Sequence, residues 1–384
     1  MNKWRRYADE LAELQAKGLY RTINVLESAQ SSHVRYQGRD MLMLASNAYL
    51  DMCRDPEVKA AAAAALAEFG VGSGGSRLLT GTSTPHARLE QTLARFKERE
   101  AALVFNSGFA ANSGIIPALT KAGDHIFSDE LNHASIIDGC RQSKAQTVIY
   151  RHNDMADLAA KLAASGAKSG LIVSDAVFSM DGDIADLPEL HRLAEQSGLL
   201  LMLDEAHATG VIGARGRGIE EHFNMSGSVD ILMGTLSKAF GAEGGYVCGS
   251  AVLIDYLRNN TRSFIFSTSL SPLVMAAAGR AVELLEQQPE RVARLQQNVR
   301  VFTAALHAKG VAADSQTAII PIFVGDEERA LAVSKRLFDE GYYISAIRYP
   351  TVKRGEAILR AALMSSHTEA ELERAAAAIA AALA

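Results

Sequence analysis

Residues 199–210, LLLMLDEAHATG, decide the fold. Five large apolar residues in a row predict a strand that is buried on both faces, and Asp204 follows where this strand ends. An ionised carboxylate is costly to bury unless a cation or a hydrogen-bond donor meets it. His207 lies in the loop just beyond, at the carboxyl end of the strand, which is where open α/β sheets bind ligands. The alternative is that Asp204 and Glu205 only cap the next helix.

Six more short apolar runs resemble this one, and amphipathic stretches of about 10 to 15 residues separate most of them. This βαβ alternation predicts an α/β fold with a mainly parallel, seven-stranded sheet between helices. The last two runs are too close together for a helical crossover, so we expect one of them to be antiparallel. The six runs are residues 101–105, 125–129, 147–151, 170–175, 230–236 and 244–249.

The rest of the chain divides around this sheet. Residues 1–45 form an N-terminal arm, in which an amphipathic helix precedes a strand pair around residues 31–40, and residues 46–288 form the large domain. From about residue 290 the rhythm of apolar runs changes, which predicts a smaller α+β C-terminal domain over residues 289–384.

The composition excludes several classes of protein. The 384 residues are 48% hydrophobic and 22% charged, as in globular proteins, and the net charge of -5 argues against a nucleic-acid binder. No apolar stretch is long enough to span a bilayer, and the N-terminus lacks the apolar run of a signal peptide. The three cysteines lie far apart, so we expect reduced thiols, no metal site and a cytoplasmic location.

Two glycine-containing motifs are candidates for binding a phosphate. GVGSGG, residues 70–75, has the dinucleotide-binding spacing, but it follows a helical stretch where that fingerprint requires a strand. NSGFAAN, residues 106–112, follows an apolar run and leads into a helix, so N–H groups around Gly108 and Phe109 would point at an anion. An ordinary Ser-Gly turn explains the second motif equally well.

Lys238 lies in TLSKAFGAEGG, residues 235–245, between an apolar strand and a glycine-rich stretch. Most lysines are solvated surface charges, but here the order of residues is informative. Asp204, His207 and Lys238 each follow a predicted strand. A lysine in this position can form a Schiff base with an aldehyde cofactor, while the aspartate pairs with the ring nitrogen of that cofactor.

Further polar residues fall at the same edge of the predicted sheet. His133 follows residues 125–129, Ser179 follows residues 170–175, and either alone is an ordinary helix cap or turn residue. Their convergence with the motifs above nevertheless predicts a site at the carboxyl ends of the strands. Arg360, in the apolar run AILRAALM, needs a carboxylate partner, which is either a substrate or an internal acid.

The motifs NSGFAAN, DELNHASIIDG, VFSMDGD, DEAHATG and TLSKAFG resemble, in this order, those of the α-oxoamine synthases. These are fold-type I enzymes that use pyridoxal 5'-phosphate (PLP) to condense an amino acid with an acyl thioester, with loss of CO2. The resemblance covers about residues 20–370. It implies a fold-type I PLP-dependent transferase, active as a homodimer with sites at the subunit interface.

The resemblance also implies roles for individual residues. The catalytic residues would be Lys238, which binds the cofactor aldehyde, Asp204, which pairs with the pyridine nitrogen, and His133, which stacks on the ring. His207 would contact the ring hydroxyl, and Ser179 would hold the cofactor. The remaining implied contacts are Gly108, Phe109 and Thr235 for the phosphate, Ser267 and Thr268 for the partner's phosphate, and Arg21, Asn47, His133, Thr351 and Arg360 for substrate.

Within the family, FGVGSGGSRLLTGT with His86 and the segment IRYPTVKRGEAILR are most similar to members that make 8-amino-7-oxononanoate for biotin from L-alanine and pimeloyl-CoA or a pimeloyl carrier protein. Two departures concern the acyl donor: the chain has Ala48 and Asp51 in its NAYLD motif, and Tyr349 and Lys353 in RYPTVK, where other residues are expected. The Tyr-Pro pair is similar to glycine C-acetyltransferase, which leaves glycine and acetyl-CoA as alternative substrates. A non-catalytic α/β ligand-binding protein is the alternative from another class.

Overall fold

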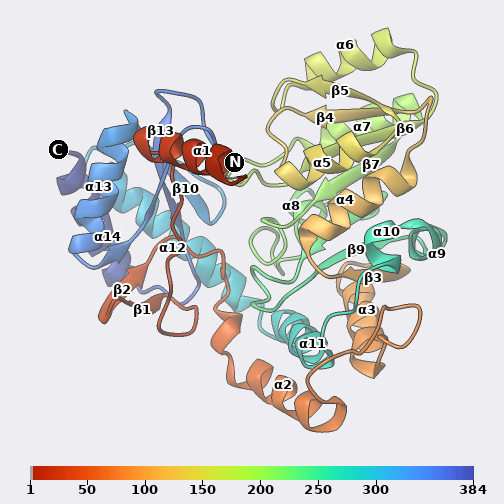
Figure 1. Ribbon diagram of the computed structural model, residues 1–384, viewed down its shortest axis with the longest axis horizontal. Coiled ribbons are helices and arrows are strands. Elements are labelled where there is room, and N and C mark those ends of the chain that lie inside the picture. The colour runs from red at the N-terminus through yellow and green to blue at the C-terminus, as the bar shows by residue number, and fades with distance from the viewer. Residues whose placement is uncertain (1–2) are drawn as a thin grey trace.

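A seven-stranded sheet forms the centre of the larger lobe in the computed structural model, which describes residues 3–384 (Figure 1). The strand order is β3-β9-β8-β7-β6-β4-β5. Only β9 runs against its neighbours, so the predicted mainly parallel sheet with one antiparallel strand is confirmed. The strands are β3 (Ala101–Phe105), β4 (His125–Asp129), β5 (Gln146–Tyr150), β6 (Gly170–Asp175), β7 (Leu200–Asp204), β8 (Ile231–Thr235) and β9 (Gly245–Gly249).

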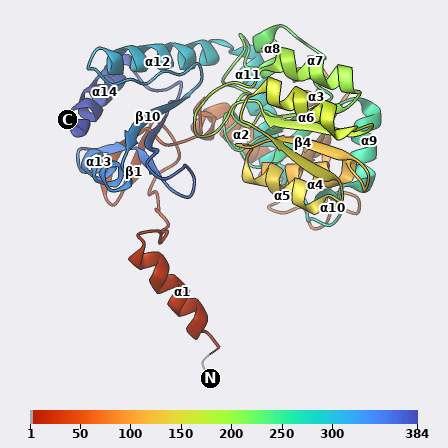
Figure 2. The same cartoon turned by 90° about the horizontal axis from the view of Figure 1, so that it is seen from above.

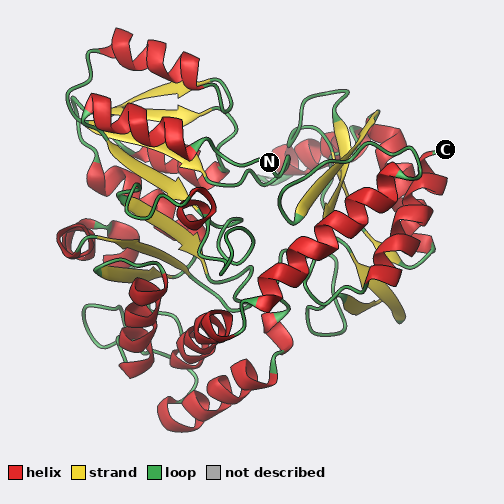
Figure 3. Ribbon diagram, turned by 180° about the vertical axis from the view of Figure 1, so that it is seen from behind, coloured by secondary structure: helices red, strands yellow, loops and turns green. Residues whose placement is uncertain are grey.

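Helices cover both faces of this sheet because its strands are apolar on both faces. Along β7, Leu201 and Leu203 pack into one core cluster and Met202 packs into another on the opposite face. The first cluster takes up residues of α3, α6, α7 and α11, and the second takes up residues of α4, α5, α9 and α10. Figure 3 shows the strands of the sheet with helices around them. The helices of this lobe are α2 (Pro56–Phe69), α3 (Thr84–Phe96), α4 (Gly108–Leu119), α5 (Ala134–Gln142), α6 (Met155–Ser165), α7 (Leu187–Ser197), α8 (Ile219–Phe223), α9 (Ala251–Asn260), α10 (Arg262–Ile265) and α11 (Pro272–Gln287), with a 3-10 turn η1 (Met52–Arg54).

The smaller lobe contains two three-stranded sheets, of orders β10-β13-β12 and β1-β2-β11. The first is antiparallel, and α12, α13 and α14 accompany it (Figure 1). In the second, the predicted N-terminal strand pair forms the hairpin β1–β2, and β2 also pairs in parallel with β11 near the other end of the chain. The elements are β1 (His33–Tyr36), β2 (Arg39–Met43), α12 (Glu290–His307), β10 (Ile319–Gly325), α13 (Glu327–Asp339), β11 (Tyr342–Tyr343), β12 (Ser345–Ile347), β13 (Ala357–Ala362) and α14 (Glu369–Leu383).

The N-terminal helix α1 (Arg5–Ala16) projects away from both lobes (Figure 2). None of its residues is buried, and Tyr7, Leu11 and Leu14 are all exposed. These apolar residues recur at helical spacing, so they line one side of the helix. Within the described residues, no helix combines the length and the apolar character needed to cross a bilayer.

Candidate active site

Asp204 ends β7 and is almost fully buried, with 3% of its surface exposed. One carboxylate oxygen accepts a hydrogen bond of 2.6 Å from the side-chain amide of Asn112, and the other accepts one of 2.8 Å from the backbone N–H of Ala206. The next helix does not begin until Ile219, so Asp204 caps no helix. Asn112 was not among the predicted site residues, although a buried asparagine among the apolar residues of α4 is unusual enough to have been a signal.

The adjacent acid, Glu205, has a different role. Its side chain is fully buried and forms an ion pair with the equally buried Lys97, and it also accepts a hydrogen bond of 2.8 Å from the backbone N–H of Ile219. A buried carboxylate with these partners is satisfied within the protein. Of the two acids in the DEAH motif, Asp204 is therefore the one available to a ligand.

Lys238 and His207, which the sequence places after β8 and β7, contact each other directly. The Lys238 Nζ lies 2.9 Å from Nε2 of His207, and Nδ1 of the same ring lies 2.6 Å from the hydroxyl of Tyr49. Burial lowers the pKa of Lys238 to about 8, although Asp204 and Asp175 act in the opposite direction. Burial and the positive charge of Lys238 hold the pKa of His207 well below its usual value.

Tyr49 extends this contact to the smaller lobe. Its hydroxyl donates to Oδ1 of Asn47 at 3.2 Å, and the same oxygen accepts from both terminal nitrogens of Arg360, also at 3.2 Å. Nε of Arg360 donates to the backbone oxygen of Ser179 at 2.6 Å. Burial raises the pKa of Tyr49 to about 12, which keeps its hydroxyl neutral. The predicted residues Asn47, Ser179 and Arg360 are thus connected to His207 through Tyr49, which the sequence analysis had not assigned.

Two of the residues predicted to bind phosphate, Gly108 and Thr235, meet where α4 begins. Gly108 is the first residue of α4, and a Cβ placed on it would lie 3.6 Å from Cβ and 3.7 Å from Oγ1 of Thr235. Thr235 ends β8, and its hydroxyl lies 2.8 Å from that of Ser237. The N-terminus of α4 therefore lies close to two hydroxyls, and N–H and O–H groups gathered in this way suit an anion. Phe109, the next residue of α4, is 48% exposed.

His133 caps the N-terminus of α5, and a hydrogen bond to the buried Asp175 holds it in position. Its backbone N–H donates to Asp175 at 2.7 Å, and its Nδ1 lies 2.7 Å from the hydroxyl of Ser135. Asp175 ends β6 directly beside Asp204, and burial together with the Asp204 charge raises its pKa well above its usual value. Asp175 was not among the predicted site residues, although it ends β6 as Asp204 ends β7.

The last predicted residues, Thr268, Arg21 and Thr351, make none of the contacts described above. Thr268 is exposed, and its backbone oxygen accepts from the side chain of Asn106 at 2.7 Å. Arg21 is exposed after α1, beside the end of β12 and the loop of residues 348–351 that follows it. Thr351 belongs to that loop and also lines a cleft that reaches Ser179.

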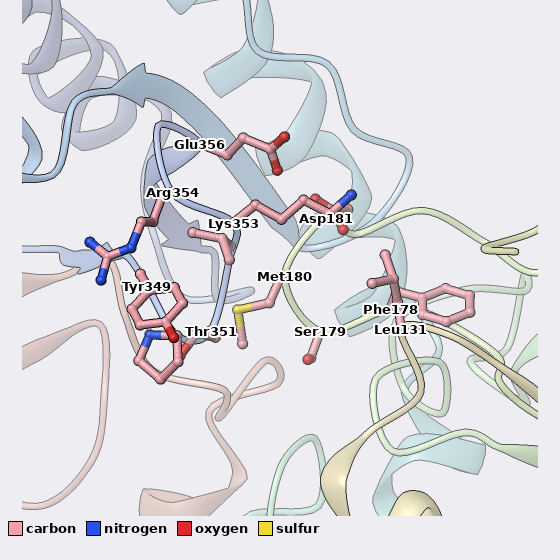
Figure 4. Close-up of a pocket in the computed structure, with 12 residues that line it drawn as sticks. Leu131, Phe178, Ser179, Met180, Asp181, Tyr349, Thr351, Lys353, Arg354 and Glu356 are labelled. Carbon is pink, nitrogen blue, oxygen red and sulfur yellow. The ribbon is translucent and has the colours of Figure 1, made fainter. Parts of the chain in front are cut away.

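This cleft has a volume of about 480 Å³ and lies between the lobes (Figure 4). One wall carries Leu131 and the segment from Phe178 to Asp181, and the other carries residues 349–354 and Glu356. Met180 points toward Tyr349 and Thr351, whereas the ring of Phe178 points away from them, and Lys353 extends toward Asp181. The walls of the cleft therefore carry both apolar and charged side chains.

Comparisons with known proteins agree with this geometry. Residues 39–379 match the model of the family described as aminotransferase class I and II. The chain belongs to this family. It is 51% identical to an 8-amino-7-oxononanoate synthase of Geobacter sulfurreducens over 98% of this chain and 97% of that protein. A second 8-amino-7-oxononanoate synthase, from Symbiobacterium thermophilum, is 48% identical over 97% of this chain and 96% of that protein.

Among solved structures, a serine palmitoyltransferase variant from S. paucimobilis with a bound PLP–myriocin aldimine matches with a TM-score of 0.92 and 34% identity. The match covers 99% of this chain and 97% of that one. These findings confirm the predicted fold-type I architecture and the resemblance to the α-oxoamine synthases.

Proposed function

We propose that this chain is a PLP-dependent acyltransferase that condenses L-alanine with a pimeloyl thioester. The products are 8-amino-7-oxononanoate, CO2 and the free thiol, and the reaction serves biotin biosynthesis. The observation that carries the proposal is the hydrogen-bonded chain from Lys238 through His207, Tyr49 and Asn47 to Arg360, which joins an amine to a carboxylate-binding guanidinium. The names of the full-length relatives select this reaction within the family.

The side chains of the site fit PLP at each of its reactive ends. The N-terminus of α4 beside Thr235 suits the phosphate, the buried carboxylate of Asp204 suits a protonated ring nitrogen, and Lys238 suits the aldehyde. His207 would contact the ring hydroxyl. His133 would lie against the ring, Ser179 would add a further contact, and Phe109 and Thr268 would complete the phosphate site.

When bound, PLP withdraws electrons from the Cα of an attached amino acid and so stabilises the carbanion formed there. The chain supplies the remaining chemistry. Because its pKa is lowered to about 8, Lys238 is neutral in a larger fraction of molecules at neutral pH than an ordinary lysine, so it would hold the cofactor aldehyde and could accept a proton from the Cα of the amino acid. Asn112 fixes the orientation of the Asp204 carboxylate, which would pair with the ring nitrogen of the cofactor.

Arg360 is suited to the carboxylate of the amino acid. Two of its N–H groups donate to one oxygen of Asn47. A substrate carboxylate would replace that oxygen and form a bidentate salt bridge with the guanidinium. We place the acyl chain in the cleft beside Ser179, with Thr351 on its far wall and Arg21 toward the arm. This position supports the proposal because Leu131 and Met180 offer the chain apolar contacts, and Leu131 lies two residues from His133 in the sequence.

We further propose that the protein works as a homodimer in the cytoplasm. The exposed apolar side of α1 and the exposed Phe109 support a second copy of this chain as the covering surface. The free cysteines Cys53, Cys140 and Cys248 fit a reducing compartment.

The test is a substrate panel. We expect the purified, PLP-loaded chain to release CoA fastest with L-alanine and pimeloyl-CoA, when alanine, glycine and serine are each offered with pimeloyl-, acetyl- and palmitoyl-CoA. A pimeloyl carrier protein is compared with pimeloyl-CoA in a parallel arm. Strong preference for glycine with acetyl-CoA would overturn the proposal in favour of glycine C-acetyltransferase. Absence of turnover with every pair would support a non-catalytic ligand-binding protein.

A further inference from the structure

His152 lies just beyond β5, outside the contacts described so far, and holds two aspartates at once. Its Nδ1 is 3.1 Å from a carboxylate oxygen of Asp129, and its Nε2 is 3.0 Å from one of Asp183. A carboxylate accepts hydrogen bonds, so both ring nitrogens must carry a proton and the ring is an imidazolium. Although burial acts against the charge, the hydrogen bonds to the two aspartates raise the pKa of His152 to about 10.

Each of these aspartates hydrogen-bonds to a different part of the cleft wall that Leu131 and residues 178–181 form. Asp129 also accepts a hydrogen bond of 2.8 Å from the backbone N–H of Leu131, which lines the cleft. The backbone oxygen of Asp183 accepts from the N–H of Phe178 at 3.0 Å, and this bond closes the turn that contains Ser179, Met180 and Asp181. The edge of Phe178 also contacts the His152 ring, with ring centroids 4.4 Å apart.

His152 is the main counter-charge of Asp183. Within residues 3–384, the only other contact of the paired Asp183 oxygen is the amide of Asn153 at 3.5 Å, and its second oxygen is buried without a partner. Burial and the negative charge of Asp183 both raise the pKa of Asp181. Without the positive charge of the imidazolium, the neighbouring carboxylates of Asp181 and Asp183 would repel each other, and the turn of residues 178–181 would shift.

We propose that His152 is a positioning residue for the acyl donor, because its doubly paired ring ties Leu131 to the turn of residues 178–181 and so fixes one wall of the cleft. The inference rests on the proposed function, which places the acyl chain in this cleft. The residue itself does not line the cleft, and it acts only through its neighbours.

The experiment separates acyl-donor binding from the other steps. With the PLP-loaded enzyme, we expect His152→Ala to raise the KM for pimeloyl-CoA and its calorimetric Kd about tenfold, because the wall that would contact the acyl chain is no longer fixed. The KM for L-alanine should rise less, because Arg360 keeps its contacts with Asn47 even if Ser179 shifts. His152→Gln keeps one donor and should give an intermediate KM, and it remains informative if the alanine variant folds poorly.

Two further variants sharpen the test. His222 contacts the edge of Phe223 much as His152 contacts Phe178, but burial alone lowers its pKa, so His222→Ala is a matched control that should change neither constant. Adding Asp183→Asn to His152→Ala removes the uncompensated charge and should restore part of the affinity for pimeloyl-CoA.

The outcomes are distinguishable. If kcat or the active fraction falls while KM and Kd for pimeloyl-CoA stay unchanged, His152 is only structural and the inference is overturned. The same holds if His222→Ala weakens acyl-donor binding equally. If the parent enzyme itself does not use pimeloyl-CoA, the proposed function fails first and this inference fails with it.

Discussion

The lowered pKa of Lys238 makes a quantitative prediction about pH. With a pKa of about 8, the amine is neutral in about 9% of molecules at pH 7, against about 0.03% for a lysine at its usual value. The reaction of Lys238 with the aldehyde of PLP should therefore be about 300-fold faster at pH 7 than that of a solvated lysine. It should rise about tenfold from pH 6 to 7 and level off above about pH 8.

The assay mixes the PLP-free chain with PLP at each pH, quenches with borohydride at fixed times, and quantifies the Lys238 adduct by peptide mass spectrometry. A short peptide that carries the same lysine is the control, and its rate should keep rising beyond pH 10. Asp204→Asn should move the midpoint to lower pH and Arg360→Gln to higher pH, because the aspartate raises this pKa and the arginine lowers it. A rate that still climbs above pH 9, or variants that shift the midpoint in one direction, would refute the reasoning.

Three further predictions concern single contacts. Asn112→Ala should raise the Kd for PLP about tenfold, measured by fluorescence titration, because the 2.6 Å bond that orients Asp204 is lost; an unchanged Kd contradicts this role. Lys97→Met should lower the unfolding free energy in urea by about 3–5 kcal/mol, because Glu205 is left as an uncompensated buried charge, and adding Glu205→Gln should recover much of the loss. Gly245→Ala should weaken PLP binding, since its Cβ would lie 2.5 Å from the carbonyl oxygen of the residue that caps α4; parent-like binding and melting temperature would argue against so tight a contact.

The strands could be predicted from sequence because most are short and apolar, and β4, β6, β7 and β8 each end at a polar residue. The run that ends at Asp204 shows this most clearly, since the observed strand is Leu200–Asp204. The antiparallel direction of β9 could also be predicted, because the link from Thr235 to Gly245 is too short to hold a crossover helix. Residues at the carboxyl ends of these strands were therefore predicted to meet, and Lys238 does contact His207.

The partners of these residues were harder to predict because they come from distant parts of the chain. Tyr49 reaches His207 across 158 positions, and Asn112 reaches Asp204 across 92. Neither pair has a local spacing that would reveal it, since each contact depends on how a helix or loop packs over the strand ends. His152 was missed for the same reason, because its charge is explained by Asp183, which is 31 positions away.

The pairing of β2 with β11 has a consequence for how the protein is made. Leu42 pairs with Tyr342, so the second sheet of the smaller lobe closes only after some 300 further residues have been synthesised. Until then, Met41, Leu42 and Met43, all buried in the finished protein, leave the ribosome on a strand with an open edge. The strands β1 and β2 are thus synthesised long before their last partner strand, β11. The nascent protein folds correctly only if these strands do not aggregate during that interval.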